Sequence, residues 1–211
     1  MGETLYEAGR DPYRYVILAV YLYISLLVGL AINPLTPIAA TSKKIYAVGG
    51  GKINLSTSTL LFANSALSLP AVAFADRVGV KVTAILGTLL LSLGFTIRTL
   101  INTDLNYIFW GQIVAGIGCP FITCVQAKVL SAWLAIKHRP LWTALTTLSP
   151  GIGIMIGFGM PILFVQTGDT LDYDQQRQGM FWYLFTEAVL AIVGFLAAAF
   201  LWKTTQKFIP A

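Results

Sequence analysis

Four polar side chains lie within long apolar stretches of the sequence or, in the case of Asn33, directly after one, where a membrane helix would hold them away from water. Glu187 is the only carboxylate well inside any of these stretches, and a carboxylate within a bilayer can bind a proton or a polar solute. Asn33, Asn64 and Gln112 carry amides that donate and accept hydrogen bonds. We therefore predict that these four residues line a substrate path. The alternative for Glu187 is a structural carboxylate, protonated or paired, which Arg98 could reach.

The sequence shows no set of residues typical of catalysis. Its single histidine, His138, stands between two basic residues, where a surface charge cluster is expected. No nucleophile with a base, phosphate-binding loop or metal-ligand spacing is visible. Cys119 and Cys124 fall within one expected helix, which favours small buried thiols over a disulfide. We predict no enzymatic activity, no cofactor and no metal site.

The composition places these groups in a membrane protein. Hydrophobic residues make up 56% of the chain and charged residues 11%, and the mean hydropathy is +0.74, whereas about 25% of a soluble domain is charged. Six apolar runs are long enough to cross about 30 Å of hydrocarbon. The predicted spans are Tyr15–Ala31, Leu55–Ala75, Val82–Leu100, Tyr107–Ala127, Trp142–Val165 and Met180–Trp202.

The predicted fold is therefore an all-α polytopic membrane protein with six transmembrane helices in a lipid bilayer. Residues 1–14 form a polar N-terminal segment, residues 15–202 the bundle, and residues 203–211 a short tail. The glycine-rich connection from Ala40 to Asn54 is expected to be the most flexible loop.

The net charge of +5 is best explained by orientation in the membrane, because cytoplasmic loops carry an excess of lysine and arginine. Both termini are predicted on the cytoplasmic side, or on the matrix side if the membrane is the mitochondrial inner membrane. Arg98 falls near the opposite surface and is expected to extend to it without a buried partner. A nucleic-acid partner is not expected, because the cations lie at helix ends and form no groove-sized patch. If the six spans alternate in direction, eight basic residues lie on the cytoplasmic side: Arg10, Arg14, Arg77, Lys81, Lys137, Arg139, Lys203 and Lys207.

A short polar turn, Ala75 to Lys81, joins the second and third spans. Asp76 and Arg77 predict an ion pair and a helix cap within the turn, and Gly79 allows a positive φ. With Lys81, these residues resemble the D-R-x-G-x-K core of the signature loop between helices 2 and 3 of the major facilitator superfamily. The alternative is an ordinary helix hairpin with a charge-paired turn.

Glycines in the fifth span predict close helix packing. Gly151, Gly153, Gly157 and Gly159 lie between two prolines, and small residues let helix backbones approach one another. The fourth span is also rich in glycine, so we expect these two spans to form the closest pair of the bundle.

Two segments resemble a particular branch of that superfamily. Residues Lys128–Trp133 and Gly151–Pro161 are similar to the corresponding parts of the feline leukaemia virus subgroup C receptor-related carriers, which are associated with haem, choline and ethanolamine transport. The resemblance implies one half of a major-facilitator fold, the N-terminal six helices, arranged as an inverted three-plus-three repeat.

Members of this superfamily hold their substrate between two six-helix halves, and this sequence supplies one half. We therefore predict an accessory or structural subunit that packs against other membrane subunits of a larger complex. The alternative is a half-size transporter of a choline-, haem- or metabolite-like solute, which works as a homodimer or with a separately encoded half.

Overall fold

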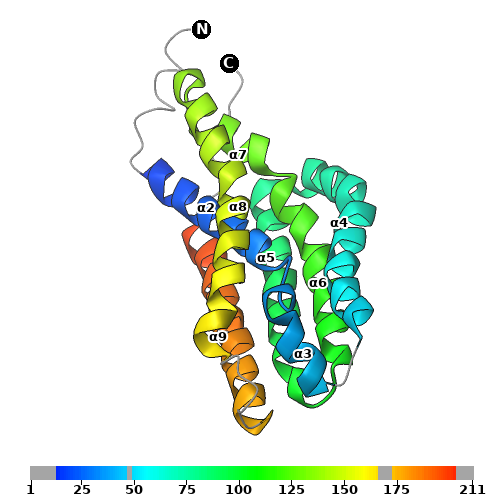
Figure 1. Ribbon diagram of the computed structural model, residues 1–211. Helices are drawn as coiled ribbons and strands as arrows, with labels where there is room; N and C mark the ends of the chain where they lie inside the picture. Colours follow the sequence, from blue (N-terminus) through cyan, green and yellow to red (C-terminus); the bar gives the residue numbers. More distant parts are fainter. Residues whose placement is uncertain (1–12, 47–48, 166–172, 203–211) are drawn as a thin grey trace, which may run out of the picture.

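The computed structural model of the chain describes residues 13–46, 49–165 and 173–202. Within these ranges all regular secondary structure is helical, which confirms the all-α class (Figure 1). Six stretches are long and apolar enough to cross a membrane, as the sequence predicts. Most of the predicted N-terminal segment and the whole tail lie outside the described residues. The six stretches are Tyr13–Leu30, Gly50–Val78, Val80–Asn102, Asn106–Trp133, Ile136–Phe164 and Tyr173–Leu201.

Each long stretch is built around one helix, and shorter helices extend or connect them. The long helices are α2 (Tyr13–Leu30), α4 (Gly50–Val78), α5 (Val80–Arg98), α6 (Asn106–Thr123), α8 (Arg139–Phe164) and α9 (Tyr173–Leu201). The short ones are η1 (Thr36–Ile38), α3 (Ala39–Tyr46), η2 (Thr99–Asn102), α7 (Gln126–Trp133) and η3 (Ile136–His138).

The connection between the first two spans is more regular than the sequence suggests. The prediction of a flexible loop from Ala40 to Asn54 is wrong for most of its length, because α3 covers Ala39–Tyr46 and α4 begins at Gly50. Helix α3 buries Thr41, Ser42 and Ile45 on one side. A short helix with so few apolar residues has no hydropathy signal, but it satisfies its backbone hydrogen bonds beside the bundle.

Gly79 makes the turn between α4 and α5, as predicted. Its φ of 93° lies in the region that glycine adopts without steric cost. The amide of Gly79 donates to the carbonyl of Ala75 at 3.2 Å, and the amide of Thr83 donates to the carbonyl of Gly79 at 3.2 Å. One residue therefore reverses the chain between α4 and α5, whereas the main packing partner of both helices is α6.

Helices α2 and α6 are the most covered spans, and α4 and α8 the least. Over half of the apolar window of α2 and of α6 is buried (56% each), compared with 17% for α4 and 22% for α8. Helix α5 makes its most extensive contacts with α6, and also packs on α9; α6 packs on α4, and α2 on α8. In Figure 1, α4 stands at one edge of the bundle, and α8 with α9 at the other.

The prediction that the fourth and fifth spans form the closest pair is wrong. Helix α6 packs mainly against α5 and α4, whereas the main partner of α8 is α2. A Cβ added at Gly153 would collide with the Leu26 carbonyl, and one added at Gly29 with the Pro150 carbonyl. The Ser149 hydroxyl donates to the carbonyl of Leu22 at 2.7 Å. The glycines thus allow a close approach, but they do not specify which helix approaches.

The four predicted packing glycines of α8 differ in their surroundings. Gly153 touches α2 most closely, and a Cβ at Gly157 would lie 3.6 Å from the Leu30 carbonyl oxygen, an ordinary contact. A Cβ at Gly151 or Gly159 would meet no atom within 4 Å. Only one side of α8 is therefore covered by the described part of the chain.

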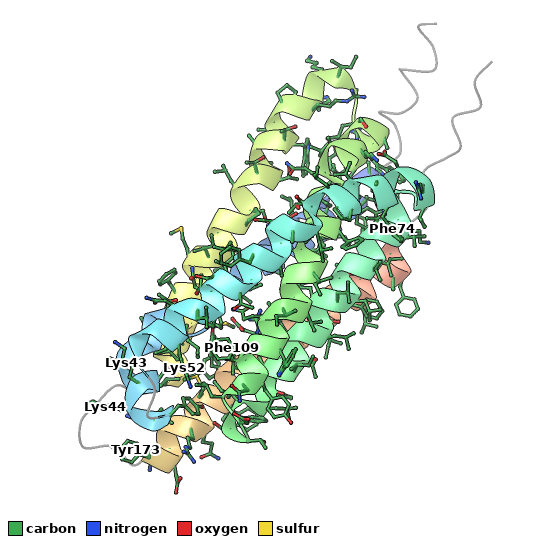
Figure 2. The ribbon with its side chains drawn as sticks, turned by 90° about the vertical axis from the view of Figure 1, so that its right-hand side faces the viewer. Lys43, Lys44, Lys52, Phe74, Phe109 and Tyr173 are labelled. Atoms are coloured by element: carbon green, nitrogen blue, oxygen red, sulfur yellow. The ribbon has the colours of Figure 1, made fainter. Side chains whose placement is uncertain are left out.

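The first and last described spans meet at one end of the bundle. The Tyr13 hydroxyl donates to the carbonyl of Leu201 at 2.6 Å, so the start of α2 lies beside the end of α9. Lys43, Lys44 and Lys52 gather at the opposite end, while Phe74 lies far from them (Figure 2).

Gly153→Ala should weaken the packing of α2 on α8, because the new methyl group overlaps backbone atoms. Overpacking of this kind costs about 1–3 kcal/mol, and it should appear as a lower thermal unfolding temperature of the purified protein in detergent. Gly151→Ala is the matched control on the same helix, since its methyl group enters open space. Equal stability of the two variants would contradict the α2–α8 contact.

Candidate functional site

Arg98 lies fully inside the bundle, not at the membrane surface. Its side chain has 0% exposure, and its Nη2 donates to Gln112 Oε1 at 2.9 Å and to the Ala31 carbonyl at 3.3 Å. The guanidinium carbon also lies 4.3 Å from the centre of the Phe95 ring. The prediction that Arg98 extends to the interface is therefore wrong. Helix α5 continues into η2 at this point, which places the residue deeper than the length of the apolar run indicates.

Glu187 is the charged partner of Arg98. Glu187 Oε2 lies 3.6 Å from Arg98 Nη1, and both side chains are almost completely buried. The Tyr183 hydroxyl, one turn away on α9, donates to Glu187 Oε1 at 2.8 Å. The structure therefore shows Glu187 paired with Arg98.

Four spans meet at this pair. Arg98 comes from α5, Gln112 from α6, and Glu187 from α9, while Ala31 follows directly after α2. The unpaired carbonyls at a helix end attract a cation, so Arg98 also stabilises the end of α2. Gly111 of α6 leaves room for the Arg98 side chain, because a Cβ at this position would lie 2.6 Å from Arg98 Cγ. We call Arg98, Gln112, Tyr183 and Glu187 the charged cluster.

The hydrogen bonding of the charged cluster is incomplete. The buried atoms Arg98 Nε, Arg98 Nη1, Gln112 Nε2 and Glu187 Oε2 have no hydrogen-bond partner among the described residues. Unpaired buried polar atoms are costly, and a charged group inside a membrane marks a functional site by default. The cluster thus combines a structural ion pair with unused hydrogen-bonding capacity.

Asn33 belongs to a second, less buried group next to the first. Its Oδ1 accepts from the Thr57 hydroxyl of α4 at 3.2 Å and from the Thr36 hydroxyl of η1 at 3.4 Å. Asn33 lies two residues after Ala31, whose carbonyl binds Arg98. The end of α2 therefore connects the neutral Asn33 group to the charged cluster.

The structure brings three of the four predicted path residues into this connected region. Gln112 and Glu187 both contact Arg98, and Asn33 lies two residues after Ala31, whose carbonyl accepts from Arg98. Asn64 is half-buried on α4, about two helical turns beyond Thr57. It lies on a helix that the rest of the described chain covers least.

The signature loop pairs its acidic residue with a different helix. Asp76 forms an ion pair with Lys128 of α7, so the predicted pairing inside the turn is wrong. Arg77 is exposed and Lys81 half-buried. Helix α7 is the last part of the fourth span, and it brings Lys128 within reach of the α4–α5 turn. The loop anchors that end of the bundle.

A polar network links three elements at the opposite end. The Tyr46 hydroxyl of α3 donates to Asn102 Oδ1 at 2.9 Å, and Asn102 Nδ2 donates to the Arg177 carbonyl of α9 at 2.9 Å. Burial raises the pKa of Tyr46 to about 12, although the nearby Arg177 charge opposes the shift. The hydroxyl therefore stays protonated and remains a donor at physiological pH.

The comparison with protein families decides the class of this chain. The sequence profile of the Major Facilitator Superfamily matches residues 21–209, which covers most of the six spans. The chain belongs to the major facilitator superfamily. The turn at residues 76–81 has the D-R-x-G-x-K pattern that resembles the signature loop of this superfamily, and the chain reverses within it at Gly79.

Several curated transporters are similar in sequence to this chain. The choline/ethanolamine transporter FLVCR1 of Mus musculus is 27% identical over 159 residues, which cover 74% of this chain and 28% of that protein. FLVCR1 of Felis catus is 25% identical over 168 residues, covering 78% of this chain and 30% of that protein. An uncharacterised MFS-type transporter of Caenorhabditis elegans is 23% identical over 184 residues, covering 85% and 31%. The chain thus spans less than a third of each relative, and its resemblance to the FLVCR branch is confirmed.

Sequence reasoning missed the central role of Arg98 and the contribution of Tyr183. A usable signal was present, because Arg98 and Glu187 are opposite charges in two different apolar spans, and such charges in membranes pair with one another. Tyr183 stands four residues before Glu187, a spacing that places both side chains on one face of a helix.

Gln112→Leu should destabilise the bundle, because it removes the shortest hydrogen bond of a fully buried guanidinium. Leaving a buried donor unpaired costs about 1–3 kcal/mol, which chemical denaturation of the purified protein can measure. Gln126→Leu is the matched control, since Gln126 is half-buried and bonds to the neutral hydroxyls of Thr146 and Thr147. A larger loss for Gln126→Leu than for Gln112→Leu would refute the central place of Arg98.

Proposed function

We propose that this chain forms one half of a solute carrier and works opposite a second six-helix bundle. The observation that carries the proposal is the similarity to choline/ethanolamine transporters over about three quarters of the chain. Carriers of this kind move a substrate between two bundles that rock against each other. The proposed substrate class is accordingly a small amino alcohol such as choline or ethanolamine. Choline carries a quaternary ammonium.

The exposed faces of α4 and α8 support the proposal that a second bundle packs against this one. Helix α4 exposes Phe62 and Leu69 at 75% and 81%, and helix α8 exposes Met155 and Leu163 at 74% and 84%. A span that meets so few neighbours in its own chain has free area for lipid or for another protein. In the proposed carrier, parts of both faces contact the second bundle.

The Asn33 group supports recognition of a hydroxyl or amine. Asn33, Thr36 and Thr57 are neutral groups that donate and accept hydrogen bonds, and each is only partly buried. Glu187 already has Arg98 as its counter-ion, so it is not free to bind an ammonium group in this arrangement. The proposed path therefore runs past Asn33 and Asn64, while Gln112 and Glu187 support it from inside the bundle.

The accessory-subunit prediction made from the sequence has less support than its alternative. The relatives that match are transporters by name. A carrier half accounts for the family, for the resemblance to the FLVCR branch and for the open faces of two spans. An enzymatic role has no positive support.

The proposed orientation places the start of α2 and the end of α9 in the cytoplasm. That end of the bundle also carries Arg77, Lys81 and Lys128, in line with the positive-inside tendency. The mitochondrial inner membrane stays a prediction.

Purified protein in lipid vesicles should take up radiolabelled choline or ethanolamine with saturation. Asn33→Leu should raise the half-saturation concentration about tenfold, which corresponds to the loss of about 1.4 kcal/mol of binding. Asp104→Asn, a change at an exposed residue outside the path, is the control and should transport normally. Flux no greater than that of empty vesicles, for both solutes, would refute the proposal.

A further inference from the structure

The oxygen of Glu187 that faces Arg98 is the one without a hydrogen bond. Oε1 accepts from Tyr183, whereas Oε2 has no donor and lies 3.6 Å from Arg98 Nη1. The hydrogen bonds of Arg98 go instead to two neutral acceptors, Gln112 Oε1 and the Ala31 carbonyl. Arg98 thus pairs with Glu187 by charge and not through a hydrogen bond, and Oε2 has a free lone pair.

We propose that Glu187 is a proton-binding site of the carrier, and that its charge controls the packing of α9 against α5. The inference rests on the proposed transport function, because the proton would cross the membrane in the same cycle as the solute. A proton from the aqueous phase on one side adds to Oε2 and turns the carboxylate into a carboxylic acid. The same proton leaves to the other side, so the step involves no redox change and a pH gradient supplies its driving force.

Protonation of Glu187 changes the electrostatics of the whole cluster. The pair is neutral when the carboxylate is charged, and it has a net charge of +1 when the carboxyl is protonated. A buried cation that loses its counter-ion is strongly unfavourable, so the bundle must admit water to Arg98 or separate α9 from α5. The contact between α5 and α9 is one of the most extensive in the bundle. Proton binding and helix movement are therefore coupled.

Among the described residues, no other charged side chain packed around Arg98 could bind the proton in place of Glu187. From α2, the Tyr23 hydroxyl donates to the Leu190 carbonyl at 2.8 Å, and from α6 the buried Cys119 thiol lies near Arg98. Helix α3 places Tyr46 near the first turns of α9, where the Tyr46 hydroxyl donates to Asn102 Oδ1. Helix α8 carries no titratable side chain after Arg139 at its start.

Infrared spectra recorded at a series of pH values test proton binding without any transport. The full-length wild-type protein in lipid nanodiscs should show a carboxylic-acid band that titrates, and Glu187→Gln should lose that band. Asp104→Asn, which removes an exposed carboxylate, should keep it. If Glu187→Gln does not fold, Arg98→Met/Glu187→Gln removes both charges and serves instead. Identical titrating bands in the wild type and the Glu187 variant would overturn the proposal.

Uptake of choline into vesicles with a clamped membrane potential tests the coupling. A gradient of about one pH unit should drive up to about tenfold accumulation by the wild type. Glu187→Gln should lose this accumulation, whereas Asp104→Asn, at an exposed residue outside the path, should keep it. Equal gradient-driven accumulation by the wild type and Glu187→Gln would overturn the inference.

The two experiments separate the inference from the proposed function. Choline flux that does not respond to pH, without a Glu187 band, refutes the proton site and leaves the carrier proposal standing. A Glu187 band without flux of any tested solute refutes the carrier and leaves the proton-binding site standing.

Discussion

A full charge inside a membrane bundle needs a counter-charge. In this bundle the buried charge is Arg98, and Glu187 is its counter-charge. Its guanidinium contacts residues from α6 and α9 and the end of α2. Breaking a buried ion pair by removing one partner costs about 3–5 kcal/mol, more than any single neutral contact at this site. The relative positions of four spans therefore depend on one side chain.

Close glycine contacts complete the arrangement away from the charges. Helix α8 lies directly on α2 through Gly153 and Gly29, and α6 lies on α5 through Gly94 and Gly118. These contacts bury α2 and α6, and they leave α4 and α8 largely uncovered. The polar groups of the proposed path then lie between the buried helices α2 and α6 and the exposed faces of α4 and α8. A second bundle on those faces would complete a substrate site.

The sequence predicted the six spans, the reversal at Gly79 and the superfamily, because apolar length and a glycine turn are local properties. It did not predict how the helices pair. The prediction for Arg98 was wrong because its depth was judged from the apolar run alone, and η2 extends the helix beyond it. Asp76 pairs with Lys128, which is distant in sequence. The α8 glycines indicated a close neighbour, but nothing in their spacing distinguishes α2 from α6.

The most direct test of this account is a double-mutant cycle on Arg98 and Glu187, measured by reversible unfolding in detergent. The account predicts that Arg98→Met and Glu187→Gln each cost about 3–5 kcal/mol, and that the double variant is more stable than either single variant. If the two losses simply add, Arg98 and Glu187 do not form the pair that organises the bundle.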